Sequence, residues 1–370
     1  MKIIMSWIKW WSAKRNSNEH QHNPTLLTAQ TNTKNNADFY NNFYSLIADN
    51  ARFKLVEAMF NLKIFDLFEN NACILECNII EALGLMPIRA KKWLHLLACE
   101  NFLIKVQLDH QQAYQLTDEF VQLMQRDTWE MIKFYFTLWE TAANENLPAV
   151  LRSEKVHEHY SSWSWPPTTK DQSVMLEDWM AKTASMSIHC LLKQINFKPV
   201  NHLLDVGGGD GTIACALVTA HPHLKATVYN LPIPAEMARD NIKSQELSHL
   251  VHVVDGNFFE DDTFPMGFDL ILFTRVLFDW DKSKNRKLLK MAYQALPKNG
   301  LVVICETFKE YNNDLCLTCE YRYIFIDNFD AHVMKTEIEY RAMLEEIGFS
   351  ILSTQEKKLG VECSLILAQK

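Results

Sequence analysis

The sequence has no regular cysteine spacing, no excess of positive charge and no long apolar run. Its nine cysteines are scattered, which argues against a secreted disulfide framework and indicates a reducing, cytoplasmic location. The net charge of -8 argues against a nucleic-acid partner, because such binding depends on Lys and Arg neutralising phosphates. The apolar run at the start is too short to span a membrane. A small-molecule role fits this composition better.

Residues 1–36 are expected to form a disordered N-terminal extension. Residues 1–11 are aromatic and apolar with two interleaved lysines, and no small-residue cleavage site follows them. They either lie on a surface or partner, or form a tail that frays or packs onto a dimer. Residues 12–36 are rich in Asn, Thr, His and Gln without periodicity, which is typical of a linker.

The length of 370 residues favours two further domains, which we place at 37–190 and 191–370. Apolar residues recur at helical spacing over 39–60, and 71–105 is predicted to form two short helices joined by a turn at 84–87. A short strand at 114–116 completes a winged-helix pattern. The second of these helices offers Arg89, Lys91 and Lys92 to DNA, but three cations on a short helix more often form a solvated face.

Aromatic residues then gather at 129–141 and 163–165, where they form either core or the wall of a pocket for a flat substrate. A linking helix is expected over 176–192, and it carries Met180. Further on, Cys316 and Cys319 have the spacing of a metal or redox pair. No second pair lies near them, so we interpret them as two thiols on a helix face and predict no metal site.

Glycine is scarce, at 10 residues in the chain, and four of the ten stand within 207–211. They follow a short apolar strand at 202–206 and precede an apolar helix, so bare backbone can approach a ligand closely there. The next strand ends at Asn230, roughly 20 residues further on, where a Rossmann-type site places the residue that binds a ribose.

Short apolar runs alternate with helical stretches from 197 to the end of the chain. The strands are expected at 203–206, 226–229, 251–254, 270–273, 301–306 and 365–368. This alternation predicts an α/β, Rossmann-like domain with a mostly parallel sheet and its ligand at the carboxyl ends of the strands. Gly207, Gly209 and Gly211 stand at one such end, and Asn230 and Asn257 at the next two.

Four further motifs follow at fixed distances: Asn-Leu-Pro at 230–232, Asp-Gly-Asn-Phe-Phe-Glu at 255–260, the run from 268 to 280 that ends in Leu-Phe-Asp-Trp, and Leu-Val-Val-Ile-Cys-Glu at 301–306. Taken together, the chain from near Asp38 to its end resembles the small-molecule O-methyltransferases of plants and bacteria. The resemblance implies S-adenosylmethionine as cofactor, a small aromatic or conjugated natural-product substrate, and a homodimer whose winged-helix domains interlock and help to roof the pocket. The cofactor contacts it implies are Asp205, Gly207, Gly209, Asn230, Leu231, Asn257, Phe258, Arg275 and Met180.

The sequence departs from this family at two cofactor positions. Relatives usually carry acids where this chain has Asn230 and Asn257. A carboxylate accepts two hydroxyl hydrogen bonds, whereas an amide offers one accepting oxygen. We expect cofactor binding weaker by roughly 1 to 3 kcal/mol, but retained because the glycines and Asp205 remain.

A larger departure affects the acid-base groups. The family histidine that takes the proton from the acceptor hydroxyl is replaced by Phe278, which cannot act as a base. Of the two glutamates that flank that histidine, the first matches Glu306 and the second falls at Met334. We therefore predict Glu306 as the remaining polar catalytic group, with Asp279 and Trp280 shaping the site. His332 or His189 is a possible substitute base.

Three functions stay open at this point. The first is a homodimeric methyltransferase that acts, by O-methyl transfer, on a small aromatic or conjugated natural-product intermediate. Either its acceptor is already anionic or a carbon or nitrogen nucleophile, or another residue replaces the missing base. The second is an enzyme of the same fold that binds S-adenosylmethionine but catalyses a pericyclic, decarboxylative or hydroxylating reaction. The third is a non-enzymatic winged-helix regulator.

Overall fold

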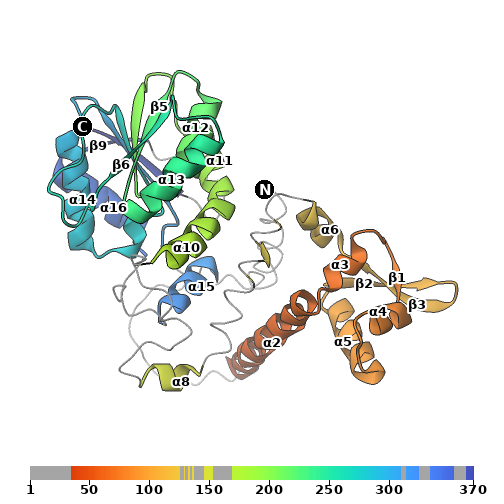
Figure 1. Cartoon of the computed structure of the whole chain (residues 1–370). Helices are drawn as coiled ribbons and strands as arrows, with labels where there is room; N and C mark the ends of the chain where they lie inside the picture. The colour runs from red at the N-terminus through yellow and green to blue at the C-terminus, as the bar shows by residue number, and fades with distance from the viewer. Residues whose placement is uncertain are drawn as a thin grey trace. The chain divides into compact units, whose positions relative to one another are not determined.

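The computed structural model (Figure 1) describes residues 35–125, 129, 132, 133, 136, 146–152, 169–309, 314–324, 334–353 and 364–370. Contacts between Cα atoms divide the chain into two units, Met1–Glu140 and Thr141–Lys370. The helices between 170 and 194 fall within the second unit, and the domain boundary expected at 190/191 lies inside the second of them. The functional roles of the three predicted segments stay predictions, and the N-terminal extension lies outside the described residues.

The first unit begins with helices α2 (Asn35–Asn61) and α3 (Ile64–Phe68). Strand β1 (Ile74–Leu75), helix α4 (Glu76–Ala82), helix α5 (Pro87–Cys99), strands β2 (Leu103–Leu108) and β3 (Gln111–Leu116), and helix α6 (Asp118–Met124) follow. The strands form an antiparallel sheet in the order β1-β3-β2. Two helices joined by a turn and followed by a hairpin form the winged-helix pattern that the sequence predicted.

The hairpin itself differs from the prediction, which had one short strand at 114–116. Strand β2 pairs with β3 along its whole length, and the two-residue turn between them is Asp109-His110. Both turn residues have positive φ, 49° and 63°, which is the backbone that matches the twist of a tight hairpin. The side chains of β2 are mostly exposed, so its apolar pattern is weak and the strand was missed.

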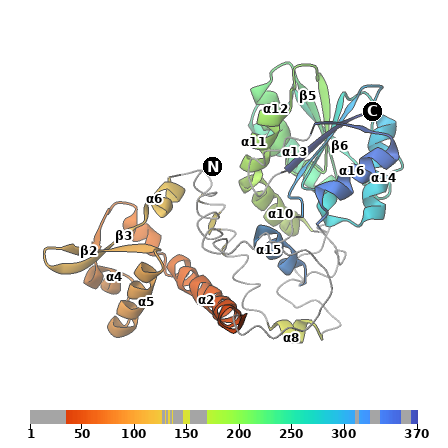
Figure 2. The ribbon, with the colours of Figure 1, turned by 180° about the vertical axis from the view of Figure 1, so that it is seen from behind.

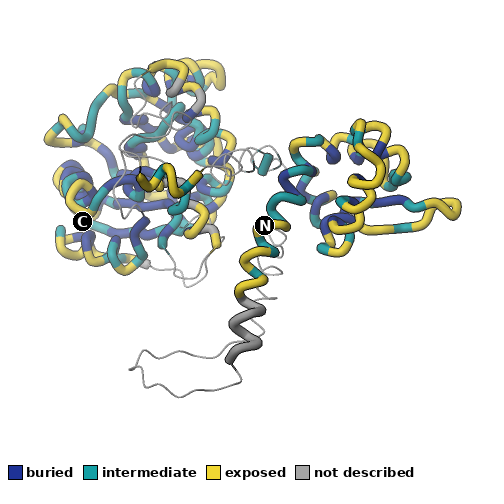
Figure 3. The backbone as a smooth tube through the Cα atoms, turned by 90° about the horizontal axis from the view of Figure 1, so that it is seen from below, coloured by how far each residue is buried: buried dark blue, intermediate teal, exposed yellow. Residues whose placement is uncertain are grey.

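Helix α2 leaves part of its apolar surface uncovered within the described part of its unit. Val56 and Met59, in its second half, are buried, but Phe43, Leu46 and Ile47 are 52%, 70% and 54% exposed. Figure 3 shows this change along the helix, from exposed to buried backbone. The predicted apolar periodicity is therefore present, but only its second half packs against the core of the unit.

The second unit opens with α8 (Leu147–Val150), α10 (Lys170–Lys182) and α11 (Ala184–Gln194). The prediction of a single linking helix over 176–192 is wrong, because the helix is interrupted at Thr183. The Thr183 hydroxyl bonds back to the carbonyl of Trp179 at 2.9 Å, and hydroxyls that bond to the preceding turn often bend helices.

A seven-stranded sheet forms the centre of this unit, in the order β6-β5-β4-β7-β8-β10-β9. The parallel strands are β4 (His202–Val206), β5 (Lys225–Asn230), β6 (Val251–Asp255), β7 (Leu270–Thr274) and β8 (Leu301–Glu306). Strand β10 (Ser364–Gln369) is antiparallel to both β8 and β9 (Ser350–Ser353). The six predicted strands and the mostly parallel sheet are confirmed, and β9 is an addition.

Helices cover both faces of this sheet (Figure 2). Helices α11, α12 (Thr212–Ala220) and α13 (Pro232–Ser244) pack on one face, and α14 (Lys282–Ala295) and α16 (Glu337–Ile347) pack on the other. Successive strand residues alternate between the two cores: Leu203 and Leu272 join the first, Leu204 and Phe273 the second. The remaining elements are the short helix η2 (Leu277–Asp279) and α15 (Asp314–Tyr323).

The described residues contain neither a candidate membrane span nor a candidate metal site. None of their helices is long and apolar enough to cross a membrane. They also contain no group of three or more His, Cys, Asp and Glu side chains placed to hold a metal ion.

Candidate cofactor site

The sheet order reverses between β4 and β7, because the chain moves from β4 outward through β5 and β6 and then returns to the other side of β4. The connecting loops diverge at such a switch point and leave a crevice at the carboxyl ends of the strands. A cavity lies at these strand ends, and residues of α10 form part of its lining.

All nine residues that the sequence suggested as cofactor contacts line this one cavity. They are Asp205, Gly207, Gly209, Asn230, Leu231, Asn257, Phe258, Arg275 and Met180. Eight come from the carboxyl ends of four neighbouring parallel strands or from the loops just after them, which explains why they meet, and Met180 comes from α10. Their contacts with the cofactor itself stay a prediction.

The glycines make room for two buried carboxylates. A Cβ on Gly208 would stand 2.5 Å from Oδ2 of Asp205, and a Cβ on Gly209 would stand 2.4 Å from Oε2 of Glu177. Gly209 also has a φ of 58°, where side chains are strained. Any larger residue in this loop therefore meets either a carboxylate or backbone strain.

Asp205 and Glu177 are 1% and 5% exposed, and both line the cavity. Neither Asp205 Oδ2 nor Glu177 Oε2 has a hydrogen-bond partner among the described residues. Burial raises the pKa of Asp205 to about 7. Burial and the nearby charge of Asp210 raise the pKa of Glu177 to about 7. The sequence analysis missed Glu177, because its position on α10 carries no local signal of a site.

Asn230 uses both ends of its amide within the protein. Its Oδ1 accepts the backbone N–H of Leu231 at 2.8 Å, and its Nδ2 donates to the carbonyl of Gly209 at 3.3 Å. The side chain therefore ties the glycine loop to the end of β5. A carboxylate at this position could not donate to Gly209, which gives a structural reason for the asparagine.

The second asparagine, Asn257, stabilises its own turn. Its Oδ1 accepts the N–H of Phe259 at 3.1 Å, and Asp261 accepts its backbone N–H at 3.1 Å. Asp261 also accepts the hydroxyl of Tyr229. A Cβ on Gly256 would stand within 2.5 Å of two ring carbons and the hydroxyl oxygen of Tyr229, so only glycine fits there. The sequence analysis missed Asp261 in this turn and Tyr229 near the end of β5.

Arg275 joins the end of β7 to the break between α10 and α11. Its guanidinium donates to the Met180 carbonyl at 2.7 Å and to the Thr183 hydroxyl. Its backbone has a φ of 57°, which is uncommon for a residue with a Cβ. These contacts fix α10 over the cavity and place a positive charge near the carboxylates of Asp205 and Glu177.

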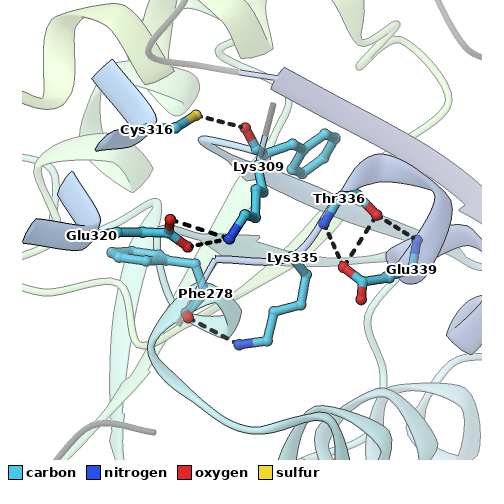
Figure 4. Close-up of polar contacts among 8 residues, drawn as sticks. Phe278, Lys309, Cys316, Glu320, Lys335, Thr336 and Glu339 are labelled. Atoms are coloured by element: carbon cyan, nitrogen blue, oxygen red, sulfur yellow. Dashed lines mark hydrogen bonds and ion pairs between the residues drawn. The ribbon is translucent and has the colours of Figure 1, made fainter. Parts of the chain in front are cut away.

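The turn at 277–280 is held from behind by two buried charged groups. Glu306 Oε2 accepts the backbone N–H groups of Leu277 at 3.1 Å and Phe278 at 3.3 Å. Lys335 Nζ donates to the Phe278 carbonyl at 3.0 Å (Figure 4). It also donates to the carbonyls of Leu277 and Trp280. Burial raises the pKa of Glu306 to about 7, against the opposing effects of Tyr340 and Lys335.

Three of the residues predicted to be catalytic, Phe278, Asp279 and Glu306, do not line the cavity. Glu306 is fully buried under the turn, Asp279 is 4% exposed, and Phe278 is half-buried. Trp280 does line the cavity, where its ring packs edge-on against Phe259 with centroids 4.5 Å apart. His332 lies outside the described residues. The catalytic roles of these residues stay predictions, and the position of Glu306 favours holding the turn.

His189, the other suggested base, is exposed on α11 and does not line the cavity. The predicted pair at 316 and 319 is described only in part: the Cys316 thiol is buried and lies 3.5 Å from the Phe308 carbonyl, and the side chain of Cys319 lies outside the described residues.

The cavity suits S-adenosylmethionine. Its charged lining residues among those described are Glu177, Asp205, Asp210 and Arg275, so acids outnumber bases. S-adenosylmethionine carries one more positive than negative charge near neutral pH, and its hydroxyl and ammonium donors match the orphaned carboxylate oxygens. The glycine loop lets the ligand approach the backbone. The residues present therefore fit this cofactor.

Comparison with known proteins points to the same conclusion. A family model described as the O-methyltransferase domain matches residues 149–350. The L-tyrosine C(3)-methyltransferase of Streptomyces lavendulae is 26% identical over 71% of this chain and 72% of its own length. The 3-hydroxy-5-methyl-1-naphthoate 3-O-methyltransferase of Streptomyces sahachiroi is 34% identical over 33% of this chain and 35% of its own length.

A solved structure shares the fold. The S-adenosylmethionine-dependent methyltransferase SibL in its apo form has a TM-score of 0.72 and 21% identity, and the superposition covers 88% of this chain and 97% of that one. The match of the family model covers more than half of the chain. The glycine loop, the sheet order and these matches agree, and the chain belongs to the O-methyltransferase domain family, as an S-adenosylmethionine-dependent methyltransferase.

Proposed function

We propose that the protein methylates an oxygen of a small aromatic or conjugated natural-product intermediate, and that it does so without a histidine base. One observation carries the second part: the turn after β7 presents Phe278 where the family resemblance places the histidine, and the described lining of the cavity contains no histidine. Phenylalanine has no proton to exchange. The acceptor must therefore reach its nucleophilic form by another route.

S-adenosylmethionine, when bound, supplies a methyl group on a sulfonium leaving group. The residues around it then act mainly by position: the glycine loop, which Asn230 fixes through its amide, holds one end, while Met180 and Trp280 limit where an acceptor can lie. Holding two reactants in near-attack geometry can supply much of the acceleration. A general base typically adds about 10²- to 10⁴-fold, and an acceptor that is already anionic near neutral pH does not need one.

The substrate class rests on the relatives and on the composition of the chain. Both relatives are named for substrates with aromatic rings, L-tyrosine and a naphthoate, and one of them methylates carbon and the other oxygen. An acidic phenol or an enol is the acceptor that we favour. A carbon or nitrogen nucleophile would also fit a site without a base.

The test is methyl transfer from labelled S-adenosylmethionine to a panel of phenols, enols and pyrroles. We expect labelled product with acceptors whose pKa lies near or below the assay pH, and little with ordinary phenols. Equal rates for acidic and ordinary phenols would contradict chemistry without a base, and labelling of no panel member would contradict the acceptor class.

The replacement at Phe278 also supports a second candidate function, an enzyme of this fold that binds S-adenosylmethionine but catalyses a non-methylating reaction. That enzyme would form product with S-adenosylhomocysteine in place of S-adenosylmethionine. Stoichiometric consumption of S-adenosylmethionine would exclude it. The labelling assay, run in parallel with S-adenosylmethionine and with S-adenosylhomocysteine, therefore distinguishes the methyltransferase from the non-methylating enzyme.

The assembly and the location are part of the proposal. The exposed apolar side chains of α2, including Phe43, Leu46 and Ile47, support a homodimer. The scattered spacing of the nine cysteines in the sequence supports a cytoplasmic location. Lys91 on α5 lies 3.5 Å from Glu76, and this acidic neighbour supports the expectation that the helix binds no nucleic acid. Sedimentation and a salt-dependent DNA-binding assay test the first and last of these points.

A further inference from the structure

The ribose-binding place at the end of β5 lacks its usual carboxylate, and the amide that replaces it is already engaged. Both ends of the Asn230 amide bond to backbone groups, Leu231 N–H and the Gly209 carbonyl. One lone pair of Oδ1 remains for a ligand hydroxyl. Two vicinal ribose hydroxyls therefore have one neutral acceptor on this side of the cavity.

A carboxylate from another element lies near the same residue of the glycine loop. Glu177 on α10 lines the cavity, and its Oε2 stands 2.4 Å from where a Cβ on Gly209 would be. Asn230 Nδ2 lies 3.3 Å from the carbonyl oxygen of that same glycine. Glu177 and Asn230 therefore converge on one residue of the loop, from α10 and from β5.

The chemistry of Glu177 fits a hydroxyl-binding role. The side chain is 5% exposed, and its Oε2 has no hydrogen-bond partner among the described residues. Two charged residues lie near it: the negative charge of Asp210 raises its pKa, and the positive charge of Arg275 lowers it. A buried acceptor of this kind is costly unless a ligand donates to it, and hydroxyl donors to a carboxylate form short, strong bonds.

We propose that Glu177 supplies the carboxylate for the cofactor's ribose hydroxyls, replacing the acid that Asn230 lacks. The inference rests on the assignment of S-adenosylmethionine as cofactor. The ribose-binding acid has thus moved from the end of strand β5 to helix α10. Asn230, relieved of that role, holds the glycine loop instead.

The test is calorimetric binding of three nucleosides to the full-length protein and to Glu177→Gln. S-adenosylmethionine, S-adenosylhomocysteine and 5′-methylthioadenosine all carry the ribose, the first two carry the ammonium group, and only the first carries the sulfonium. We expect Glu177→Gln to weaken all three by a similar factor of about 10, because one charge-assisted acceptor is lost. The control is Asp178→Asn, which removes the same charge from the next residue, whose carboxylate is exposed and pairs with Lys182 at 2.7 Å. It should leave all three affinities unchanged.

A second variant makes the test independent of folding defects. Glu177→Gln combined with Asn230→Asp returns a carboxylate to the strand end and should restore most of the lost affinity. Loss confined to S-adenosylmethionine would assign Glu177 to the sulfonium, and loss confined to the two ligands with an amino-acid tail would assign it to the ammonium. Either result, or unchanged affinities, overturns the ribose assignment, whereas a wild-type protein that binds none of the three overturns the cofactor assignment instead.

Discussion

Lys335 offers a sharp test of how the turn at 277–280 is held. Its ammonium group is buried with the side chain, which is 2% exposed, and donates to the carbonyls of Leu277, Phe278 and Trp280. Replacement by Met keeps a flexible side chain of similar length but removes the charge and the three donated bonds. Glu306, whose carboxylate accepts two backbone N–H groups of the same turn, then loses a nearby positive charge.

The expected loss is large for a single substitution. Removing one partner from a buried charged network typically costs about 3 to 5 kcal/mol. For a unit of about 200 residues, each kcal/mol shifts the melting temperature by about 2 to 4 °C, so Lys335→Met should melt about 6 to 20 °C lower. Calorimetry of the full-length protein measures this in the transition of the second unit.

The matched control is Lys284→Met, on the first turn of α14. That side chain is 47% exposed, lies 3.7 Å from Asp281 and covers the Trp280 ring at 5.3 Å. Its loss should cost about 1 kcal/mol or less. If Lys335→Met melts within 2 °C of this control, the ammonium group does not hold the turn and the reasoning is refuted.

Three further predictions concern the site. Burial raises the pKa of Glu306 from 4.5 to about 7 in the folded state, so folding takes up a proton at pH values between these two, and the contribution of Glu306 to wild-type stability falls as the pH rises through them. The free energy of unfolding of Glu306→Gln should therefore rise by about 3 kcal/mol relative to that of the wild type between pH 4 and pH 8, as measured by urea titration. Parallel pH profiles of the two proteins would contradict this. Phe278→His should leave the rate on the native acceptor unchanged and add activity on ordinary phenols, whereas a large gain on the native acceptor would indicate an impaired site. Asn230→Asp should lower the free energy of unfolding by about 1 kcal/mol without ligand, because the carboxylate cannot donate to the Gly209 carbonyl, and an unchanged urea midpoint would show that this bond contributes nothing.

The architecture of the second unit and most of the cavity lining could be predicted from the pattern of residues along the chain. Apolar runs separated by helical stretches identify parallel strands, and the residues just after such strands, including Asp205, Gly207 and Asn257, must meet at one edge of the sheet. The apolar spacing and the turn residues at 84–87 also predicted the two helices joined by a turn in the first unit. Short elements with exposed side chains, β2 and β9, were missed because their apolar pattern is weak.

The contacts between polar groups that are far apart in the sequence could not be predicted from it, because they depend on how the elements pack. Glu177 reaches Gly209 because α10 crosses the strand ends, and Glu306 and Lys335 meet the turn at 277–280 from the end of β8 and the start of α16. The sequence therefore placed Glu306 among the catalytic groups, while the fold buries it behind the turn. Periodicity and spacing report which face of an element is apolar, but the approach of side chains far apart in sequence is set by how helices pack onto the sheet.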